Sequence, residues 1–312
     1  MARSLSDPEP AHKSGRRLTG GPVMALFGEG KDVRKSGLGG MRMTQEETRP
    51  GAQPSAFEAH TPQRIAELVE TSGVGKANLP VLKILLLAVL AGAFISLGAM
   101  VFTVTVTGSD LGLGPTRLLG GLAFSLGLIL VVVGGAELFT GNSLMVMAWV
   151  DGKIEISALA RNWVLVYLGN LAGAVATAVI AWRAGILEIG GGAVLETATH
   201  IAISKFELSF EQNFWRGLLC NVLVCLAVWL CVAARSVPGK ILAILFPISA
   251  FVAIGLEHSV ANMYFLPIAA FSGVPEATLA RIAGNILPVT LGNMVGGGGF
   301  VAFIYWMIYR RP

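Results

Sequence analysis

The sequence predicts an all-α integral membrane protein with six transmembrane helices, arranged as an inverted repeat of three plus three. Three observations predict this fold class. Hydrophobic residues make up 54% of the 312 positions and charged residues only 13%, about half the charged fraction of a typical soluble domain. Six apolar runs follow position 80. Two of these runs contain matching polar interruptions, one in each half of the chain.

The start of the chain differs in composition from the rest. Residues 1–60 mix Gly, Pro, Ser and charges of both signs without periodicity, which predicts a disordered extension followed by a transmembrane domain at 61–312. That domain should begin with a short helix, because Thr61 is a typical N-cap, Pro62 suits the first helical position and Gly73 suits the end. Its apolar residues share one face, so we expect it to lie along the membrane surface.

The apolar runs are long enough to be spans, since about 20 helical residues cross roughly 30 Å of hydrocarbon. They cover about 80–106, 117–149, 159–183, 213–234, 238–270 and 284–309. Because the number of spans is even, both termini should lie on the same side. Eight Lys and Arg residues flank the spans on the side of the termini and five on the other, which favours cytoplasmic termini.

The second and fifth runs are interrupted by Gly and polar residues at equal spacing. The matching residues are Gly135, Glu137 and Asn142 in the second run and Gly255, Glu257 and Asn262 in the fifth. A Gly-Asn-x-x-Gly pattern follows each set, at 169–173 in the third run and 292–296 in the sixth. This order indicates an internal repeat, and with three spans in each half the two halves enter the membrane in opposite directions.

Broken helices at matching places are typical of channels and transporters, because non-helical backbone is tolerated in hydrocarbon only where protein or a cavity satisfies its polar groups. The two breaks therefore predict a pore between them. The alternative is that the glycines only kink helices that pack closely together. The acidic residues and the histidine in the breaks favour the pore.

His258 is predicted to lie inside the membrane, beside the second break. An ionisable side chain costs at least a few kcal/mol there and is found mainly on substrate or proton pathways, and imidazole gains and loses a proton near neutral pH. Thr140 offers a hydroxyl to His258 if the two breaks face each other. Glu137 and Glu257 are interpreted as carboxylates that accept hydrogen bonds from the amides of the broken segments, with direct contact with a substrate as the alternative.

Further candidates lie near the same level of the membrane. Five apolar residues form either hydrophobic constrictions or ordinary core: Phe124, Leu128, Leu138, Phe139 and Phe251. Lys205, in the polar stretch before the fourth run, and Asn221, within that run, are polar candidates, although a surface lysine and a packing asparagine are the plainer interpretations. Cys220, Cys225 and Cys231 have spacings that match no metal or disulfide framework. We expect no metal and no cofactor.

Several motifs carry a resemblance that extends over residues 61–310. They are Thr-Pro-Gln-Arg-Ile-Ala at 61–66, Lys-Ala-Asn-Leu-Pro at 76–80, Glu-Leu-Phe-Thr-Gly-Asn at 137–142, Glu-His-Ser-Val-Ala-Asn-Met at 257–263 and Asn-Ile-Leu-Pro-Val-Thr-Leu-Gly-Asn at 285–293. In these motifs the chain resembles the formate/nitrite transporter family, which includes formate, nitrite and hydrosulfide channels. The resemblance implies an aquaporin-like protomer in a homopentamer with one pore per subunit, in the inner (plasma) membrane, with cytoplasmic termini.

The resemblance also implies roles for the candidate residues. The residues expected at the substrate pore are His258, Thr140, Glu257, Asn262, Lys205 and Asn221. His258 matches the family's central pore histidine, and Thr140 matches the polar residue that faces it. Lys205 and Asn221 match a lysine and an asparagine proposed to attract anions and to support the site. The five apolar candidates match positions that form or flank two constrictions around the histidine.

The function implied by the resemblance is pH-dependent passage of a small monovalent weak-acid anion across the bilayer. Formate is the first expectation and nitrite the second, with hydrosulfide, acetate and lactate as further alternatives. A water or glycerol channel would carry paired Asn-Pro-Ala motifs, which both breaks lack, and an ammonium channel would need more spans and a pair of histidines. An intramembrane enzyme would need a nucleophile or metal pattern that the sequence lacks. No basic stripe is present to bind nucleic acid.

Overall fold

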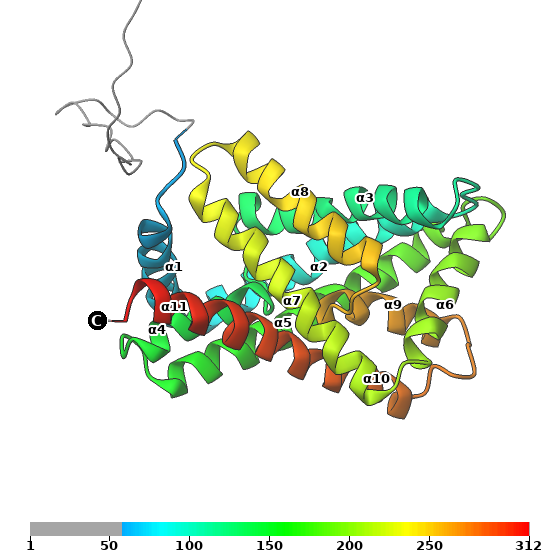
Figure 1. The fold of residues 1–312 in the computed structure, drawn as a ribbon. Helices are drawn as coiled ribbons and strands as arrows, with labels where there is room; N and C mark the ends of the chain where they lie inside the picture. Colours follow the sequence, from blue (N-terminus) through cyan, green and yellow to red (C-terminus); the bar gives the residue numbers. More distant parts are fainter. Residues whose placement is uncertain (1–57, 312) are drawn as a thin grey trace, which may run out of the picture. The chain divides into compact units, whose positions relative to one another are not determined.

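A computed structural model describes residues 58–311 of the chain, so most of the predicted extension at 1–60 lies outside the described residues. All regular structure in the described part is helical (Figure 1). The helices in chain order are α1 Pro62–Ala77, α2 Val81–Val106, α3 Leu113–Gly134, η1 Gly141–Met145, α4 Val146–Val150, α5 Ile156–Arg183, η2 Ile186–Glu188, α6 Ala193–Phe206, α7 Phe210–Ala233, α8 Val237–Ile254, α9 Ser259–Phe271, α10 Leu279–Met294, η3 Val295–Phe303 and α11 Ile304–Tyr309.

Six helical segments of the described chain are long and apolar enough to cross a membrane, which confirms the predicted all-α class and the number of spans. They are α2, α3, α5, α7, α8 and the continuous helix Leu279–Tyr309. This last helix contains a π-helical stretch, η3, where four consecutive glycines occur at 296–299. The short apolar helices Gly141–Val150 and Ser259–Phe271 complete the second and fifth apolar runs.

The second and fifth runs each consist of two helical pieces separated by non-helical backbone. Helix α3 ends before Gly135, which has a φ of 81°, and η1 begins at Gly141. Helix α8 ends before Gly255, whose φ is also 81°, and α9 begins at Ser259. This left-handed conformation suits glycine, which has no Cβ to clash with the backbone. Each break therefore begins at a residue that can leave the helix at little cost.

Close packing between spans accounts for the second repeated pattern. Helix α2 packs on α5, and α7 packs on α10. A Cβ at Gly173 would collide with the main-chain oxygen of Val89, and a Cβ at Gly296 would collide with that of Leu218. The glycines of both Gly-Asn-x-x-Gly patterns therefore let two helix backbones approach each other, as is common in membrane proteins.

A short helix precedes the spans of each half. Helix α1 has Thr61 as its N-cap, with the hydroxyl accepting a hydrogen bond from Arg64 N at 3.4 Å. The prediction that this helix ends at Gly73 is wrong, because α1 continues to Ala77 and Gly73 packs in mid-helix against Ala148. Helix α6 was expected as part of a polar connection rather than as a helix. Helices α1 and α6 lie at opposite ends of the bundle (Figure 1).

Helix α1 is tied to the C-terminal helix by a buried carboxylate. Glu70, of which only 1% is exposed, accepts a hydrogen bond from Arg310 Nε at 2.8 Å and forms an ion pair with Lys153. Next to it, Trp306 Nε1 donates to Asp151 Oδ1 at 2.7 Å. These contacts fix α1 to α11 and to the α4–α5 connection, so the start and the end of the described chain lie at the same end of the bundle.

Candidate functional site

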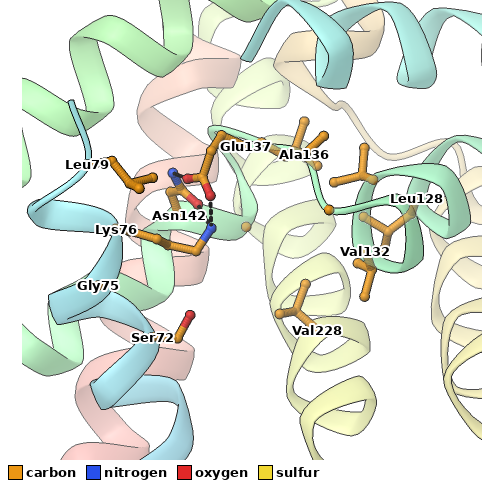
Figure 2. Close-up of a pocket in the computed structure, with 14 residues that line it drawn as sticks. Ser72, Gly75, Lys76, Leu79, Leu128, Val132, Ala136, Glu137, Asn142 and Val228 are labelled. Atoms are coloured by element: carbon orange, nitrogen blue, oxygen red, sulfur yellow. Dashed lines mark hydrogen bonds and ion pairs between the residues drawn. The ribbon is translucent and has the colours of Figure 1, made fainter. Parts of the chain in front are cut away.

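The first break is held by a lysine, a glutamate and an asparagine. Lys76, on α1, donates to Glu137 Oε1 at 2.6 Å and to Asn142 Oδ1 at 3.0 Å. Asn142 donates from Nδ2 to Glu137 Oε2 at 2.7 Å. The buried carboxylate is thus compensated by one ammonium and one amide, as a charge in a low-dielectric environment requires. Figure 2 shows these three side chains meeting at the edge of a cavity.

The second break repeats this arrangement with different residues. Lys205, on α6, donates to both oxygens of Glu257 at 2.9 and 3.0 Å. Asn262 donates from Nδ2 to Glu257 Oε2 at 2.7 Å. One difference is that Asn262 Oδ1 is buried without a hydrogen-bond partner among the described residues, whereas its counterpart in the first break accepts from a lysine. Lys205 is therefore a largely buried ion-pair partner and not a surface lysine.

The polar main-chain groups freed by the breaks are bonded by two further asparagines. Asn170, on α5, accepts from Phe139 N at 2.9 Å and donates to Glu137 O at 2.9 Å and Ala88 O at 2.8 Å. Asn293, on α10, accepts from Ser259 N at 3.0 Å and donates to Glu257 O at 3.1 Å and Gly217 O at 2.7 Å. These are the asparagines of the Gly-Asn-x-x-Gly patterns. Each pattern therefore supplies glycines for a close helix contact and an asparagine that hydrogen-bonds the main-chain groups of a break.

The interpretation of the two glutamates needs a correction. Glu137 and Glu257 do accept amide hydrogen bonds, but from the side chains of Asn142 and Asn262 and not from main-chain N–H groups. Their second partners are the lysine ammoniums. In the non-helical stretches the main-chain N–H groups are bonded elsewhere, as at Phe139.

Sequence reasoning missed several members of these networks. Lys76 was not recognised as the counterpart of Lys205. Asn162 and Asn285 were also missed, although each accepts a hydrogen bond from the asparagine of its break, at 2.9 and 2.7 Å. A signal was available, because each of these two asparagines stands eight residues before the asparagine of a Gly-Asn-x-x-Gly pattern.

The two breaks meet at a buried histidine and threonine. Thr140 Oγ1 lies 3.0 Å from His258 Nε2, with 0% of Thr140 and 3% of His258 exposed. His258 is also the N-cap of α9, and its Nδ1 accepts from Ala261 N at 3.1 Å. Because Nδ1 accepts, the proton of a neutral imidazole must be on Nε2. This arrangement directs an N–H donor toward the Thr140 hydroxyl.

Asn221 supports the pair and does not face a cavity. Its Nδ2 lies 2.6 Å from Asn293 O, 3.1 Å from Ser143 Oγ and 3.2 Å from Thr140 O. It therefore connects the break that carries Thr140 to α10, which holds the other break. The same carbonyl of Thr140 accepts from Cys225 Sγ at 3.4 Å.

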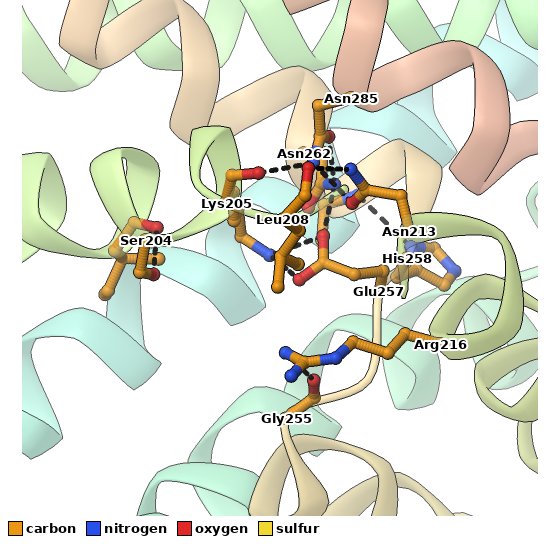
Figure 3. Close-up of polar contacts among 12 residues, drawn as sticks. Ser204, Lys205, Leu208, Asn213, Arg216, Gly255, Glu257, His258, Asn262 and Asn285 are labelled. Carbon is orange, nitrogen blue, oxygen red and sulfur yellow. Dashed lines mark hydrogen bonds and ion pairs between the residues drawn. The ribbon is translucent and has the colours of Figure 1, made fainter. Parts of the chain in front are cut away.

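Two cavities lie toward opposite ends of the bundle, and the second reaches His258. The first has a volume of about 570 Å³, and its lining includes Lys76, Glu137 and Asn142. The second has a volume of about 240 Å³, and its lining includes Lys205 and Glu257 together with His258 and Asn262 (Figure 3). Each cavity thus has one Lys–Glu pair in its lining.

Apolar side chains also line both cavities. Leu128 and Leu138 line the first, and Phe124 and Phe251 line the second. The Phe251 ring stacks on His258 with centroids 6.0 Å apart. Phe139, the fifth apolar candidate, lines neither cavity and packs edge-to-face on Trp163 and Tyr167 of α5. Phe139 therefore belongs to the packing between the first break and α5.

The fold and this site define a multi-pass membrane transport protein, in which two cavities with one Lys–Glu pair each lie on either side of a buried histidine and threonine. Comparison with known families agrees. A family model described as "Formate/nitrite transporter" matches residues 63–307. The chain therefore belongs to the formate/nitrite transporter family, as its motifs predict.

Relatives of known sequence and structure support this assignment. The chain is 38% identical over 278 residues to formate channel FocA of Escherichia coli K12, an alignment that covers 82% of this chain and 96% of that one. It is 43% identical over 265 residues to a probable formate transporter of Methanothermobacter thermautotrophicus, covering 79% and 93%. Among solved structures, a pentameric formate channel with formate bound is 42% identical, with a TM-score of 0.69, and covers 74% of this chain and 98% of that one. An ion channel of the same family is 31% identical, with a TM-score of 0.73, covering 80% and 99%.

Proposed function

We propose that this protein conducts small monovalent anions of weak acids, with formate as the principal substrate, through a pore in each protomer that passes His258. The observation that carries the proposal is the buried pair of His258 and Thr140 between two cavities that are each lined by a Lys–Glu pair. Relatives that are named a formate channel and a probable formate transporter favour formate over nitrite. Hydrosulfide, acetate and lactate use the same chemistry and are alternatives for the same pore.

The wider context of the pore is part of this proposal. Residues 61–312 form the channel unit, which assembles as a homopentamer in the inner membrane, with both termini cytoplasmic and the two halves of the chain inverted. A similar channel is described as pentameric, which supports the assembly, and the excess of flanking Lys and Arg supports the orientation. The protein acts without enzymatic chemistry and without metal or cofactor.

The mechanism follows from the cost of moving a charge through an apolar barrier. Lys76 and Lys205 attract an anion into either cavity, while their glutamate partners keep it from being trapped. The anion cannot cross the apolar barrier as an ion, because desolvating a charge is costly. At the barrier it accepts a hydrogen bond from His258 Nε2–H. When the imidazole has first taken up a proton from cavity water, it passes one proton to the anion and returns to its neutral form. The neutral acid then crosses and releases that proton to the water of the other cavity. Flux should therefore rise as the pH falls.

The test is uptake of formate, nitrite, hydrosulfide, acetate and lactate into proteoliposomes at several pH values, with the variant His258→Asn alongside. Asparagine is a good N-cap, so it can replace the Nδ1 acceptor of the imidazole for Ala261 N while removing the titratable group. We expect selective formate flux that rises with acidity in the unaltered protein and loses this pH dependence in the variant. An unchanged rate and pH profile in the variant would contradict the role of His258, and no flux of any anion would contradict the function.

A further inference from the structure

The second cavity contains more positive charge than the first. Its lining includes three basic side chains and one acidic side chain: Arg117, Lys205, Arg216 and Glu257. The first cavity has one basic and one acidic side chain, which form an ion pair. The excess in the second cavity comes from two arginines that the conduction mechanism above does not use.

Both arginines converge on the glycine at which the second break begins. Arg216, on α7, donates to Gly255 O at 3.4 Å (Figure 3). Arg117, on α3, donates to Ala253 O at 3.4 Å, and its Nη1 lies 3.1 Å from the position that a Cβ on Gly255 would occupy. These bonds are at the long end of hydrogen-bond distances and use few of the five donors on each guanidinium. Both side chains are exposed, and neither forms an ion pair with a carboxylate within the described residues.

The corresponding positions of the other half carry no charge. Glu257 N donates to Arg216 O and Glu137 N donates to Leu87 O, so Leu87 is the counterpart of Arg216. Val237 stands 18 residues before Gly255, as Arg117 stands 18 before Gly135. The framework of the breaks is therefore repeated, whereas the arginines occur on one side only.

We propose that Arg117 and Arg216 form an entry site that binds a small monocarboxylate at the mouth of the second cavity, before the anion reaches Lys205, and that the first mouth has no equivalent site. The planar guanidinium matches a carboxylate with two parallel hydrogen bonds, which a lysine cannot do. Because Gly255 has no side chain, the Arg117 guanidinium lies close to the main chain at this point, on the same residue that accepts from Arg216. This inference rests on the proposed function.

A one-sided entry site changes the formate concentration at which uptake from that side is half-saturated. A passive pore has the same permeability in both directions at low concentration, since the net flux must vanish when the two concentrations are equal. A site at one mouth instead lowers the half-saturating concentration for entry from that side. Entry from the α6 side should therefore saturate at lower formate concentrations than entry from the α1 side.

The test measures formate uptake from each side separately, in phosphatidylcholine vesicles where the protein has one orientation, verified by protection of an N-terminal affinity tag from added protease. The variant is Arg117→Gln with Arg216→Gln. The matched control is Arg183→Gln with Arg281→Gln, which removes the same charge from residues that line neither cavity. We expect the variant to raise the half-saturating concentration on the α6 side by roughly tenfold, as two charges acting over several ångströms in a partly aqueous mouth would, and the control to leave it unchanged.

Added salt and lipid composition separate the outcomes. The difference between the unaltered protein and the variant should shrink at about 1 M inert salt, where screening acts over roughly 3 Å. Equal half-saturating concentrations in the unaltered protein and the variant, or equal increases from both sides, would overturn the entry site. An effect that appears only with anionic lipid, and equally from both sides, would assign the arginines to lipid phosphates and also overturn it. Absence of formate flux in the unaltered protein would instead overturn the proposed function.

Discussion

The ion pair between Lys205 and Glu257 allows a quantitative test of how the breaks are stabilised. Only 13% of the Lys205 side chain and 4% of the Glu257 side chain are exposed. Changing Lys205 to Met removes the ammonium and leaves the carboxylate with Asn262 as its only side-chain donor in the described part of the protein. Removing one member of a buried ion pair costs about 3–5 kcal/mol, because the other charge is left without compensation.

This cost translates into a shift in melting temperature. A chain of this size loses about 2–4 °C for each kcal/mol, so Lys205→Met should melt roughly 6–20 °C below the unaltered protein. Adding Glu257→Gln removes the uncompensated charge, while the glutamine oxygen can still accept from Asn262. The double variant should therefore recover most of the loss, which corresponds to a coupling free energy of about 2 kcal/mol or more.

The assay is thermal unfolding of the four members of this double-mutant cycle, purified in one detergent and followed by loss of the intact oligomer on size exclusion. Lys76→Met is the matched comparison from the first break, where the lysine and the glutamate are 27% and 8% exposed. It should cost less than Lys205→Met, because its carboxylate is closer to water. If the double variant melts as low as the sum of the two single losses predicts, the two groups are not coupled and the reasoning is refuted.

Two further predictions concern the break and the anchor of α1. Gly135 has a φ of 81°, so Gly135→Ala should cost about 1–2 kcal/mol, and its melting temperature should lie below that of Gly114→Ala, a control with open space at the added Cβ; equal values would contradict this. The network that Asp151 shares with Glu70, Trp306 and Lys153 holds the pKa of Asp151 at about 2, below the usual 3.8, because the Trp306 N–H and the Lys153 ammonium favour its charged form. Because this pKa is lower in the folded protein than in the unfolded chain, ionised Asp151 stabilises the fold above about pH 3.8. This stabilisation is lost only as the pH falls from there toward 2. Asp151→Asn should therefore leave the rise in formate uptake between about pH 7 and 4.5 unchanged. If the variant shows no such rise, the pH dependence comes from the contacts that hold α1 to α11 and not from His258.

The sequence predicts the spans well because burial in lipid demands a long apolar run, which is visible in one dimension. It also identifies the repeated residues of the breaks, since equal spacing does not depend on tertiary structure. It does not reveal that Lys76 and Lys205 pair with the glutamates, because those contacts join residues 61 and 52 positions apart. Helix α6 is missed for a related reason: its mixture of Thr, His, Ser and apolar residues has too weak a periodicity to separate it from a connection.

Phe139 shows a second limit of sequence reasoning. Leu138 lines the first cavity, whereas Phe139, the next residue, packs on Trp163 and Tyr167. Neighbouring side chains in non-helical backbone point in different directions, so adjacency in the sequence does not mean a shared surface. Both residues are apolar and both are buried, and only the path of the chain decides which one faces the cavity.

The two halves repeat the residues that stabilise the breaks, but they do not repeat the histidine and threonine between the breaks. This difference has a physical reason. Both breaks present the same problem, which is polar backbone without partners inside an apolar layer, and both halves solve it with a lysine, a glutamate and asparagines. At the centre, His258 stands 120 positions after Leu138, and Thr140 stands 120 positions before Val260. Two apposed histidines would compete for one proton and would place two ionisable groups in the barrier, each at a cost of several kcal/mol. A single imidazole, with Nδ1 committed to capping α9 and Nε2–H directed at a hydroxyl, supplies one donor where the anion must lose its water.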